Sequence, residues 1–385
     1  MPGGQAAALL THAPGTHPTA RGREQIGSGA VKILTVVGNR PQFVKAAAVS
    51  GLLREAHEEI LVHTGQHYDD AMSEVFFREL GLERPERELG ISGGSNASQV
   101  QRMWDALKGL TATVAPDAVL VYGDTNSTLA GARAGELAEI PVVHVEAGMR
   151  SFDQRMPEEV NRIATDWVSS LLLCSSEVAR TNLASEGVPG KAVVVGDVMV
   201  DVALRWQPRA RERSEALAAE LGVKTGEYLL VTAHRAGNVD DPRRLTDLVE
   251  LLRALPGEVV FPVHPRTQAR LHAAGLWEEL AGSAGMHLIG PLGYAEFTAL
   301  LCGARAMLTD SGGVQKEAYL AGVKCVTLRD STEWVETVQA GWNTLVDLDL
   351  DATLNALKRP LPAERPQLYG DGHAAERCVA AIGAL

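Results

Sequence analysis

Cysteine is scarce in this chain, and its placement argues against several classes of protein. The 385 residues include only four cysteines, and no two of them form a Cys-x-x-Cys pair. This pattern argues against a disulfide framework and against a structural zinc site, and it favours a reducing cytoplasm. No group of His, Cys, Asp and Glu has the spacing of a metal site, so we expect no bound metal.

Long apolar runs are also missing. No run reaches the roughly 18 residues that a membrane helix needs. Residues 1–29 are rich in Gly, Ala, Pro and Thr, and their apolar run Ala6–Leu10 is too short for the core of a signal peptide. We expect this lead to be a disordered extension, or the result of a misplaced start codon.

Positive charge is in deficit. The 36 Lys and Arg against 48 Asp and Glu give a net charge of −12. An acidic chain is a poor non-specific binder of nucleic acid or membrane, so we expect neither partner. Hydrophobic residues make up 45% and charged residues 22%, as in a soluble globular protein.

The fingerprints of two common nucleotide sites are absent as well. No Gly-x-Gly-x-x-Gly follows a predicted strand, since Gly27-Ser-Gly29 precedes the first one. No Gly-Lys-Ser/Thr closes the glycine-containing turn at Asp310–Gly313, so that turn is not a Walker A loop. The sequence therefore predicts no dinucleotide cofactor.

The chain does contain a regular alternation of short apolar runs and amphipathic stretches, typical of βαβ units in a parallel sheet. Strands are predicted at Val31–Val37, Ile60–His63, Ala118–Tyr122, Val142–Val145, Leu171–Ser175, Val193–Val195, Tyr228–Thr232, Val259–Val263, His287–Ile289, Ala306–Leu308 and Cys325–Leu328. Helices are predicted at Pro41–Glu55, Tyr68–Leu80, Ser98–Val114, Ser127–Ala138, from Pro157 onward, and at Asp201–Thr225, Pro242–Leu255, Thr267–Leu280, Tyr294–Cys302, Gly313–Ala321 and Asp371–Leu385.

The pattern restarts near Tyr228, which predicts two similar α/β halves. We expect an N-terminal Rossmann-like domain over 30–198, a C-terminal one over 199–365, and a final helix within 366–385 that returns to the first. The fold class is therefore α/β, with two doubly wound Rossmann-like domains facing each other across a cleft. Clefts between domains are frequent ligand sites.

Acidic side chains gather where predicted strands of the first half end. Asp124 follows Ala118–Tyr122, Glu146 follows the apolar run at Val142–Val145, and Glu158 begins the next helix. Ligands of parallel α/β sheets bind at such strand ends, and carboxylates there suit proton transfer. A solvated loop with surface ion pairs is the alternative for the segment as a whole. For Asp124, a helix N-cap is an equal alternative.

Basic and glycine-containing turns mark phosphate sites in both halves. Such residues at a helix N-terminus favour phosphate oxygens. Three basic residues at such turns also have explanations that need no ligand. Arg40 could donate to a nearby carbonyl oxygen, His67 could be an ordinary polar loop residue, and His264 could pack on Pro265. The candidates are Arg40, Lys45, His234, Arg235, Ser311, Gly312 and Gly313, with Glu317 placed to bond a ribose diol.

Jointly, these residues resemble the non-hydrolysing UDP-N-acetylglucosamine 2-epimerases, which have a glycosyltransferase-B-like fold. The resemblance covers the chain from about residue 31 to 385, everything except the N-terminal lead. The motifs that carry it are Gly38-Asn-Arg-Pro41, Thr64-Gly-Gln-His67, Gly123-Asp-Thr125, His144-Val-Glu-Ala-Gly148, Pro157-Glu-Glu-Val-Asn-Arg162, His234-Arg235, Asp310-Ser-Gly-Gly-Val-Gln315, Arg329-Asp330 and Tyr369-Gly-Asp-Gly372.

The resemblance implies interconversion of UDP-GlcNAc and UDP-ManNAc, by anti elimination of UDP to a 2-acetamidoglucal and re-addition of UDP. It needs no cofactor and implies a homodimer. By similarity Asp124, Glu146 and Glu158 are the acid–base candidates, and His234 stabilises the leaving group. Arg162, four residues after Glu158, is expected to hold the charge of that carboxylate. Glu317 resembles the ribose-binding glutamate.

The chain departs from the family pattern at several positions. Asn39 replaces the usual Thr, Gly237 stands where Glu is usual, and Trp334-Val335-Glu336 replaces an Arg-Pro-Glu or Trp-Pro-Glu. A second substrate site, allosteric in the family, would involve Gln66, His67 and His264, and its activity is in doubt because Tyr68-Asp69-Asp70 follows His67.

Other functions remain open at this point. The sugar could be a UDP-2,3-diacetamido-glucuronate, which needs an extra cationic contact. A hydrolytic variant or a catalytically inactive UDP-sugar sensor would share most of the motifs. A glycosyltransferase of the same fold is disfavoured, because three carboxylates exceed what simple transfer needs.

Overall fold

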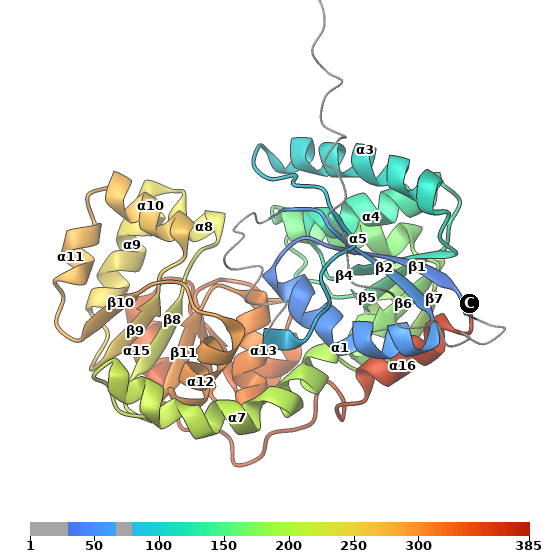
Figure 1. Cartoon of the computed structure of the whole chain (residues 1–385). Helices are drawn as coiled ribbons and strands as arrows, with labels where there is room; N and C mark the ends of the chain where they lie inside the picture. The colour runs from blue at the N-terminus through green and yellow to red at the C-terminus, as the bar shows by residue number, and fades with distance from the viewer. Residues whose placement is uncertain (1–29, 67–78) are drawn as a thin grey trace, which may run out of the picture.

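The computed structural model describes residues 30–66 and 79–385, which form two separate parallel sheets flanked by helices (Figure 1). In the first sheet the strand order is β3-β2-β1-β4-β5-β6-β7, and in the second it is β10-β9-β8-β11-β12-β13. All pairings between these strands are parallel. The predicted fold class, α/β with two doubly wound Rossmann-like domains, is confirmed.

The strands agree closely with the predicted apolar runs. Two were not predicted, β3 and β13; they are short edge strands, and β3 is exposed, so neither produces a long apolar run. The bounds are β1 Lys32–Val37, β2 Glu58–His63, β3 Arg87–Glu88, β4 Ala118–Tyr122, β5 Val142–Ala147, β6 Leu171–Cys174, β7 Lys191–Val194, β8 Leu229–Thr232, β9 Val259–Pro262, β10 Met286–Ile289, β11 Ala306–Thr309, β12 Lys324–Thr327 and β13 Asn343–Leu345.

The helices lie between these strands in the chain and cover both faces of each sheet (Figure 1). Their bounds are α1 Arg40–Ala56, α3 Asn96–Val114, α4 Asn126–Leu137, α5 Pro157–Val168, α6 Glu177–Glu186, α7 Val198–Glu220, α8 Ala236–Val239, α9 Pro242–Arg253, α10 Pro265–Ala273, α11 Trp277–Ala281, α12 Tyr294–Gly303, α13 Gly312–Ala321, α14 Val335–Gln339, α15 Leu350–Lys358 and α16 Ala374–Ile382.

Three expectations about helices need comment. The single helix predicted over Thr267–Leu280 is wrong: Gly275 adopts a left-handed φ of +72° and separates α10 from α11. The helices α6, α8, α14 and α15 were not predicted, since they are short and bury few apolar side chains. Most of the helix predicted over Tyr68–Leu80 falls outside the described residues.

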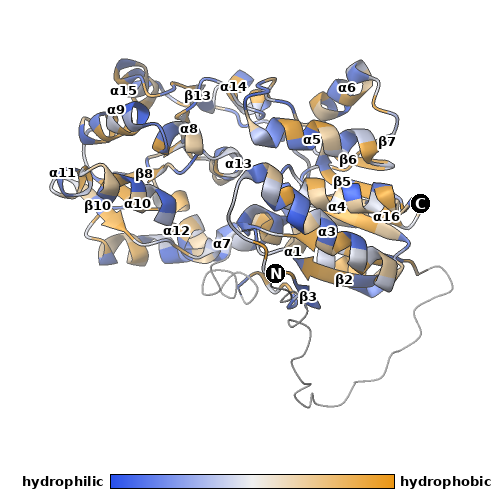
Figure 2. Ribbon diagram, turned by 90° about the horizontal axis from the view of Figure 1, so that it is seen from above, coloured by the Kyte–Doolittle hydropathy of each residue, from blue (hydrophilic) through white to orange (hydrophobic). Residues whose placement is uncertain are grey.

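Apart from β3 and β13, each strand contributes side chains to two hydrophobic clusters, one on each face of its sheet. In β1, Ile33 and Val37 join a cluster with α1, whereas Leu34 and Val36 join another with α3 and α4. Strand β8 alternates in the same way between its two clusters. Burial on both faces explains why these strands read as continuous apolar runs, which Figure 2 shows as hydrophobic strands between helices of mixed polarity.

Helix α7 connects the two halves. Its first turns place Val198, Met199 and Val202 in a cluster of the first sheet, and Ala218 near its end joins a cluster of the second. Helix α16 returns to the first sheet, where it packs beside α1 and α7 (Figure 1). The chain thus crosses between its halves twice.

The strand order reverses once in each sheet. In the first sheet the chain moves outward from β1 to β3 and then resumes at β4 on the other side of β1; in the second it does the same between β8 and β11. Loops that leave neighbouring strands at such a point diverge to opposite faces and leave room for a ligand at the carboxyl ends of the strands. The reversals therefore lie at β1/β4 and at β8/β11.

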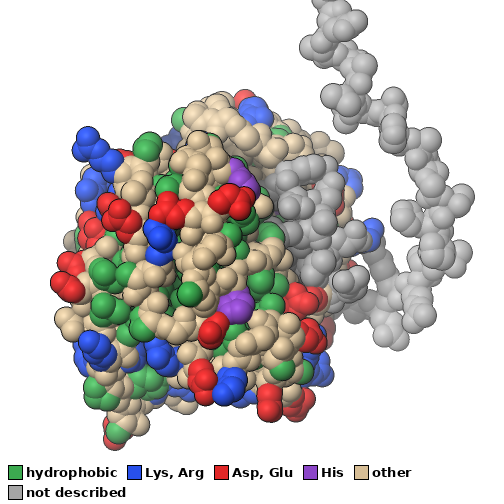
Figure 3. Space-filling view, turned by 90° about the vertical axis from the view of Figure 1, so that its left-hand side faces the viewer, with side chains coloured by type: hydrophobic (Ala, Val, Ile, Leu, Met, Phe, Trp, Pro, Cys, Tyr) green, Lys and Arg blue, Asp and Glu red, His purple; other side chains and the backbone are tan. Residues whose placement is uncertain are grey.

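No helix in the described part of the chain is both long and apolar enough to cross a membrane. On the face of the second domain drawn in Figure 3, acidic and basic side chains are interspersed rather than separated by sign.

Gly148, directly after β5, is a position that the fold requires to be glycine. Its φ is +78°, and a Cβ there would lie 2.3 Å from the carbonyl oxygen of Ala179. We expect Gly148→Ala to lower the free energy of unfolding by about 3 kcal/mol, from left-handed strain and overpacking. Gly109→Ala is the control: Gly109 lies in α3 with open space around it, so alanine should stabilise by about 0.5–1 kcal/mol. Equal effects in urea unfolding would contradict this reading.

Candidate functional site

The predicted site residues lie at the carboxyl ends of the strands where each sheet reverses. The first sheet contributes Arg40 and Lys45 on α1, Asp124 after β4, Glu146 at the end of β5, and Glu158 and Arg162 on α5. The second contributes His234 and Arg235 after β8, and Ser311, Gly312, Gly313 and Glu317 around the start of α13. Contacts between the two sets bring them together at the interface of the domains.

Glu146 has an unusual backbone. Its φ is +72°, and the pairing of β5 with β6 shifts register between Val145 and Ala147. A bulge of this kind redirects a side chain, and a left-handed non-glycine residue costs about 1–3 kcal/mol. Such strain persists only where surrounding contacts compensate for it. Here they do so by fixing the carboxylate of Glu146.

Two lysines hold that carboxylate. Oε1 pairs with Lys45 of α1, and Oε2 accepts a hydrogen bond of 2.8 Å from Lys316 of α13. Burial alone would raise the pKa of Glu146, but Lys316 and Lys45 outweigh it and lower that pKa to about 2. Glu146 is therefore an ionised carboxylate at neutral pH, positioned by a cation from each domain.

A buried network under Glu146 holds β5 to its neighbours. The His144 Nδ1 lies 2.7 Å from the carboxylate of Asp166 on α5, and its Nε2 lies 2.7 Å from the carbonyl oxygen of Gly123. Asp166 also accepts a hydrogen bond of 2.7 Å from Arg150 and one from the Gly148 N–H. This network fixes the loop that carries Asp124 relative to the strand that carries Glu146.

Asp124 does not cap α4. The N-cap is Thr125, which forms a capping box with Thr128, so the N-cap alternative for Asp124 is wrong. The Asp124 carboxylate instead pairs with Arg162, whose other nitrogen donates to Glu159 at 2.6 Å. The side chain of Arg162 is 2% exposed and that of Asp124 is 27% exposed. Asp124 is thus held by the buried Arg162 while part of its own side chain remains exposed.

The expected pairing of Arg162 with Glu158 is wrong. The two residues are one turn apart on α5, but Arg162 faces the sheet, where Asp124 and Glu159 take both of its terminal nitrogens. Glu158 faces the second domain, with Oε2 3.8 Å from Arg235. The spacing of Glu158 and Arg162 along α5 does not determine how the helix is rotated about its axis, and this rotation decides the partner of Arg162.

His234 is held by the second sheet. Asp310, after β11, accepts hydrogen bonds from the backbone N–H groups of His234 and Arg235 at 3.0 and 2.9 Å. The His234 ring stacks on His264 with 5.3 Å between ring centroids. Burial, reinforced by Arg235 and Arg40, lowers the pKa of His234 despite the nearby Asp310. The imidazole is therefore neutral at neutral pH.

The turn before α13 has the features of an anion site. Ser311 is the N-cap of this helix, and Gly312 and Gly313 are its first residues, so their N–H groups have no partner within the helix. A Cβ on Gly312 would lie 1.9 Å from Oε1 of Glu333, so a larger residue there would have to displace the Glu333 side chain. The N-terminus of α13 can therefore hold a phosphate group close to the backbone.

Glu317 lies one turn inside α13 and faces Arg40 of the other domain. Burial raises the pKa of Glu317, while Arg40 and Lys316 oppose that rise. The guanidinium of Arg40 also lies over the ring of Phe297, 5.2 Å from its centroid. Arg40 thus reaches from the first residue of α1 into the second domain.

The residues predicted for a second substrate site are only partly described. Gln66 accepts hydrogen bonds from the Ser127 backbone N–H at 3.0 Å and from its hydroxyl at 2.7 Å. His264 is the N-cap of α10 and stacks on His234. His67 lies outside the described residues. The allosteric role therefore stays a prediction.

Two charged residues of the site, Lys316 and Glu333, were not predicted. Lys316 precedes Glu317 and bonds Glu146, and Glu333 lies among Arg329, Arg235 and Arg162, which lower its pKa against the effect of burial. Lys316 directly follows the recognised motif Asp310–Gln315, and Glu333 lies four residues after Arg329. Their partners lie far away in the chain, so only the fold reveals the contacts.

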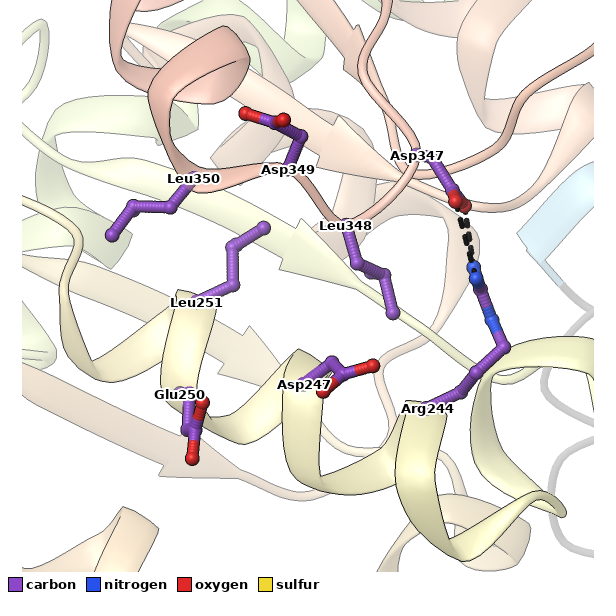
Figure 4. A pocket seen from close by; sticks show the side chains of 8 residues that line it. All are labelled: Arg244, Asp247, Glu250, Leu251, Asp347, Leu348, Asp349 and Leu350. Atoms are coloured by element: carbon purple, nitrogen blue, oxygen red, sulfur yellow. Dashed lines mark hydrogen bonds and ion pairs between the residues drawn. The ribbon is translucent and has the colours of Figure 1, made fainter.

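Other parts of the described chain are less suggestive. No group of three or more His, Cys, Asp and Glu in residues 30–66 and 79–385 is arranged to hold a metal ion. A hollow beside α9 and the start of α15 is lined by several carboxylates, and Arg244 pairs with Asp347 at its edge (Figure 4). None of its lining residues belongs to the predicted site.

Comparison with known proteins gives a consistent result. A family model described as UDP-N-acetylglucosamine 2-epimerase matches residues 52–383. The UDP-2,3-diacetamido-2,3-dideoxy-D-glucuronate 2-epimerase of Pseudomonas aeruginosa is 46% identical, over 90% of this chain and 98% of that protein. A UDP-N-acetylglucosamine 2-epimerase homolog of Methanococcus maripaludis is 43% identical, over 91% of this chain and 98% of that protein.

A solved structure has the same fold throughout. The UDP-GlcNAc 2-epimerase of Methanocaldococcus jannaschii, in complex with UDP-GlcNAc and UDP, superposes with a TM-score of 0.86 and 38% sequence identity. The match covers 92% of this chain and all of the other, 100%.

The ionised state of Glu146 has a consequence for stability. Because its pKa is lowered from 4.5 to about 2 in the folded protein, it stabilises the fold above pH 4.5 and loses that contribution as the pH falls toward 2. We expect the free energy of unfolding of the wild type to fall by about 2 kcal/mol more than that of Glu146→Gln between pH 6 and pH 3. Urea unfolding at several pH values measures this, and parallel pH dependences would contradict it.

Proposed function

This chain belongs to the UDP-N-acetylglucosamine 2-epimerase family, and we propose that it reversibly interconverts UDP-N-acetylglucosamine and UDP-N-acetylmannosamine. One observation carries the proposal: Glu146 of the first domain contacts α13, the helix of the second domain whose N-terminus forms the phosphate-type turn. An acid–base reaction on a diphosphate ligand needs that combination.

In the proposed reaction, UDP leaves C1 and a proton leaves C2 from the opposite face, which gives a 2-acetamidoglucal. UDP then adds back with the configuration of C2 inverted. The stereocentre is lost in the alkene and rebuilt, so no redox cofactor is needed. Oxocarbenium character at C1 makes the C2 proton acidic enough for carboxylate bases.

We assign the acid–base steps to Glu146, Asp124 and Glu158. The ionised state of Glu146 supports a role as base, and the anchoring of Asp124 by Arg162 supports a fixed second position. Glu158 borders Arg235, close to where a diphosphate would lie.

The UDP moiety is assigned mainly to the second domain. The start of α13, with Ser311, Gly312 and Gly313, would hold the diphosphate, and Glu317 would bond the ribose diol. Arg40 and Arg235 lie near His234, and these three would stabilise the charge that develops on the leaving group. Lys45 and Arg162, which pair with Glu146 and Asp124, complete the proposed substrate-binding set. A neutral His234 suits hydrogen bonding to a phosphate oxygen.

A second sugar is the main alternative. The Pseudomonas aeruginosa relative, which acts on a UDP-2,3-diacetamido-glucuronate, shares 46% of its residues with this chain. A uronate substrate needs a cation for its carboxylate, and Arg235 and Arg329 stand near the proposed site. A non-catalytic UDP-sugar sensor is a further alternative. A homodimer and a cytoplasmic location belong to the same proposal.

Proton NMR of the protein with UDP-GlcNAc in D2O tests the reaction directly. We expect UDP-ManNAc to appear, with deuterium at C2 of both sugars, because the C2–H bond breaks and re-forms in solvent. The same experiment with UDP-2,3-diacetamido-glucuronate tests the alternative sugar. Release of free UDP and a free sugar, with no epimerised UDP-sugar, would indicate a hydrolytic variant. No exchange with either sugar would contradict the proposal and favour a sensor.

Carboxylate variants test the assignment of roles. Glu146→Gln and Asp124→Asn are each expected to lower kcat by at least about 10²-fold, because a positioned acid–base group contributes that much. The Kd for UDP, from calorimetry, should change little. Glu177→Gln is the control, since Glu177 pairs with Arg180 on an exposed face of α6. Near-wild-type rates in both site variants would contradict the assignment.

A further inference from the structure

Lys316 connects the two domains at a single buried ammonium group. It lies on α13 and is 1% exposed. Its Nζ donates to Oε2 of Glu146 at 2.8 Å, pairs with Asp197, and lies 4.1 Å from the centroid of the Trp334 ring. A lysine this buried needs such partners, since an unpaired ammonium would be costly to bury.

The three charged groups of this cluster come from different parts of the fold. Glu146 ends β5 of the first sheet, Asp197 is the N-cap of the connecting helix α7, and Lys316 lies on α13 of the second domain. The helix of Lys316 is also the one whose N-terminus is proposed to hold the diphosphate. One ion-pair cluster therefore links the proposed UDP-binding helix to the acid–base carboxylate.

The two lysines on Glu146 are not equivalent. Lys45 lies on α1, in the same domain as Glu146, so their pairing does not depend on how the domains sit against each other. Lys316 belongs to the other domain, so its pairing with Glu146 exists only when the domains are together. Of these two cations, only Lys316 makes a contact with the carboxylate that depends on how the domains are arranged.

We propose that Lys316 is a positioning residue, which keeps Glu146 ionised and oriented when the second domain is seated against the first. This inference rests on the proposed function, in which Glu146 is an acid–base group. Lys316 then couples the domain that binds UDP to the carboxylate that transfers the proton. Lys316 acts through Glu146 and needs no contact with the sugar.

The charges around Glu146 support this assignment. Lys45 from α1 and Lys316 from α13 are the titratable groups that lower its pKa, and Asp197 from α7 faces Lys316 from the other side. Asp124, on the neighbouring loop, is paired with Arg162 instead. Loss of Lys316 would leave burial opposed by Lys45 alone, so the pKa of Glu146 would rise.

Lys316→Met tests the inference. The acidic limb of the kcat/KM profile is expected to move to higher pH by about one unit or more, because Glu146 must be ionised to accept a proton. At neutral pH kcat should fall at least about tenfold, with the Kd for UDP changed by less than about threefold. Lys316→Arg should restore most of the rate. A profile of Lys316→Met that superimposes on the wild type would overturn the proposal.

Two further variants control for misfolding of Lys316→Met and for the general effect of removing a lysine. Lys316→Met leaves the buried Asp197 without its cation and could fail to fold. The double variant Lys316→Met/Asp197→Asn removes both charges. Asn is chosen because it can still act as the N-cap of α7. The double variant should show the same shift of the acidic limb. Lys324→Met is the matched control, since Lys324 donates to main-chain carbonyls of the second domain. Its pH profile should match the wild type.

A titration without turnover separates this inference from the proposed function. In UDP-bound protein labelled with ¹³C in glutamate side chains, Glu146 is identified by its absence in Glu146→Gln. Its titration midpoint should rise in Lys316→Met, whichever sugar is the substrate. A raised midpoint with no epimerisation by the wild type would reject the proposed reaction and keep the role of Lys316. An unchanged midpoint would reject the role of Lys316 even if the wild type epimerises.

Discussion

The site depends on the buried ion pairs that the carboxylate of Glu146 makes with Lys45 and Lys316. A buried charge is stable only when it is paired, and here each oxygen has its own cation from a different domain. The bulge in β5 and the left-handed φ of Glu146 are the backbone cost of aiming that group. Because one of the two cations crosses the interface, the geometry of the site and the seating of the domains depend on the same contact.

The surrounding structure is organised to make that contact possible. Both sheets reverse their strand order where the domains meet, so the loops of β4 and β5 face those of β8 and β11. The network of His144, Asp166 and Arg150 fixes the first set from beneath. Asp310, which accepts from two backbone N–H groups, fixes the second. Each set of loops is rigid for reasons internal to its own domain.

The sequence predicted what depends on local pattern and strand ends. Parallel strands buried on both faces are apolar throughout, so their positions and the fold class could be predicted from hydrophobic runs. The strand ends then indicated Asp124, Glu146, His234 and Ser311 as residues that meet. These inferences need only the rule that parallel strands present their carboxyl ends on one edge.

Contacts between distant segments could not be predicted in the same way. The partner of Arg162 depends on the rotation of α5 about its axis, which spacing alone leaves open. Lys316 meets Glu146 across 170 positions of sequence and between two domains, so no local pattern marks the pair. Glu333 is hidden for the same reason, since its arginines come from both domains.

The three carboxylates of the site have very different surroundings, and this difference bears on an epimerisation. Glu146 is buried with two cations, Asp124 is partly open and held by one, and Glu158 is over a third exposed beside Arg235. A reaction that removes a proton from one face of a ring and returns it to the other needs groups that are not interchangeable. The asymmetry comes from the fold, since each carboxylate leaves a different element and meets a different cation.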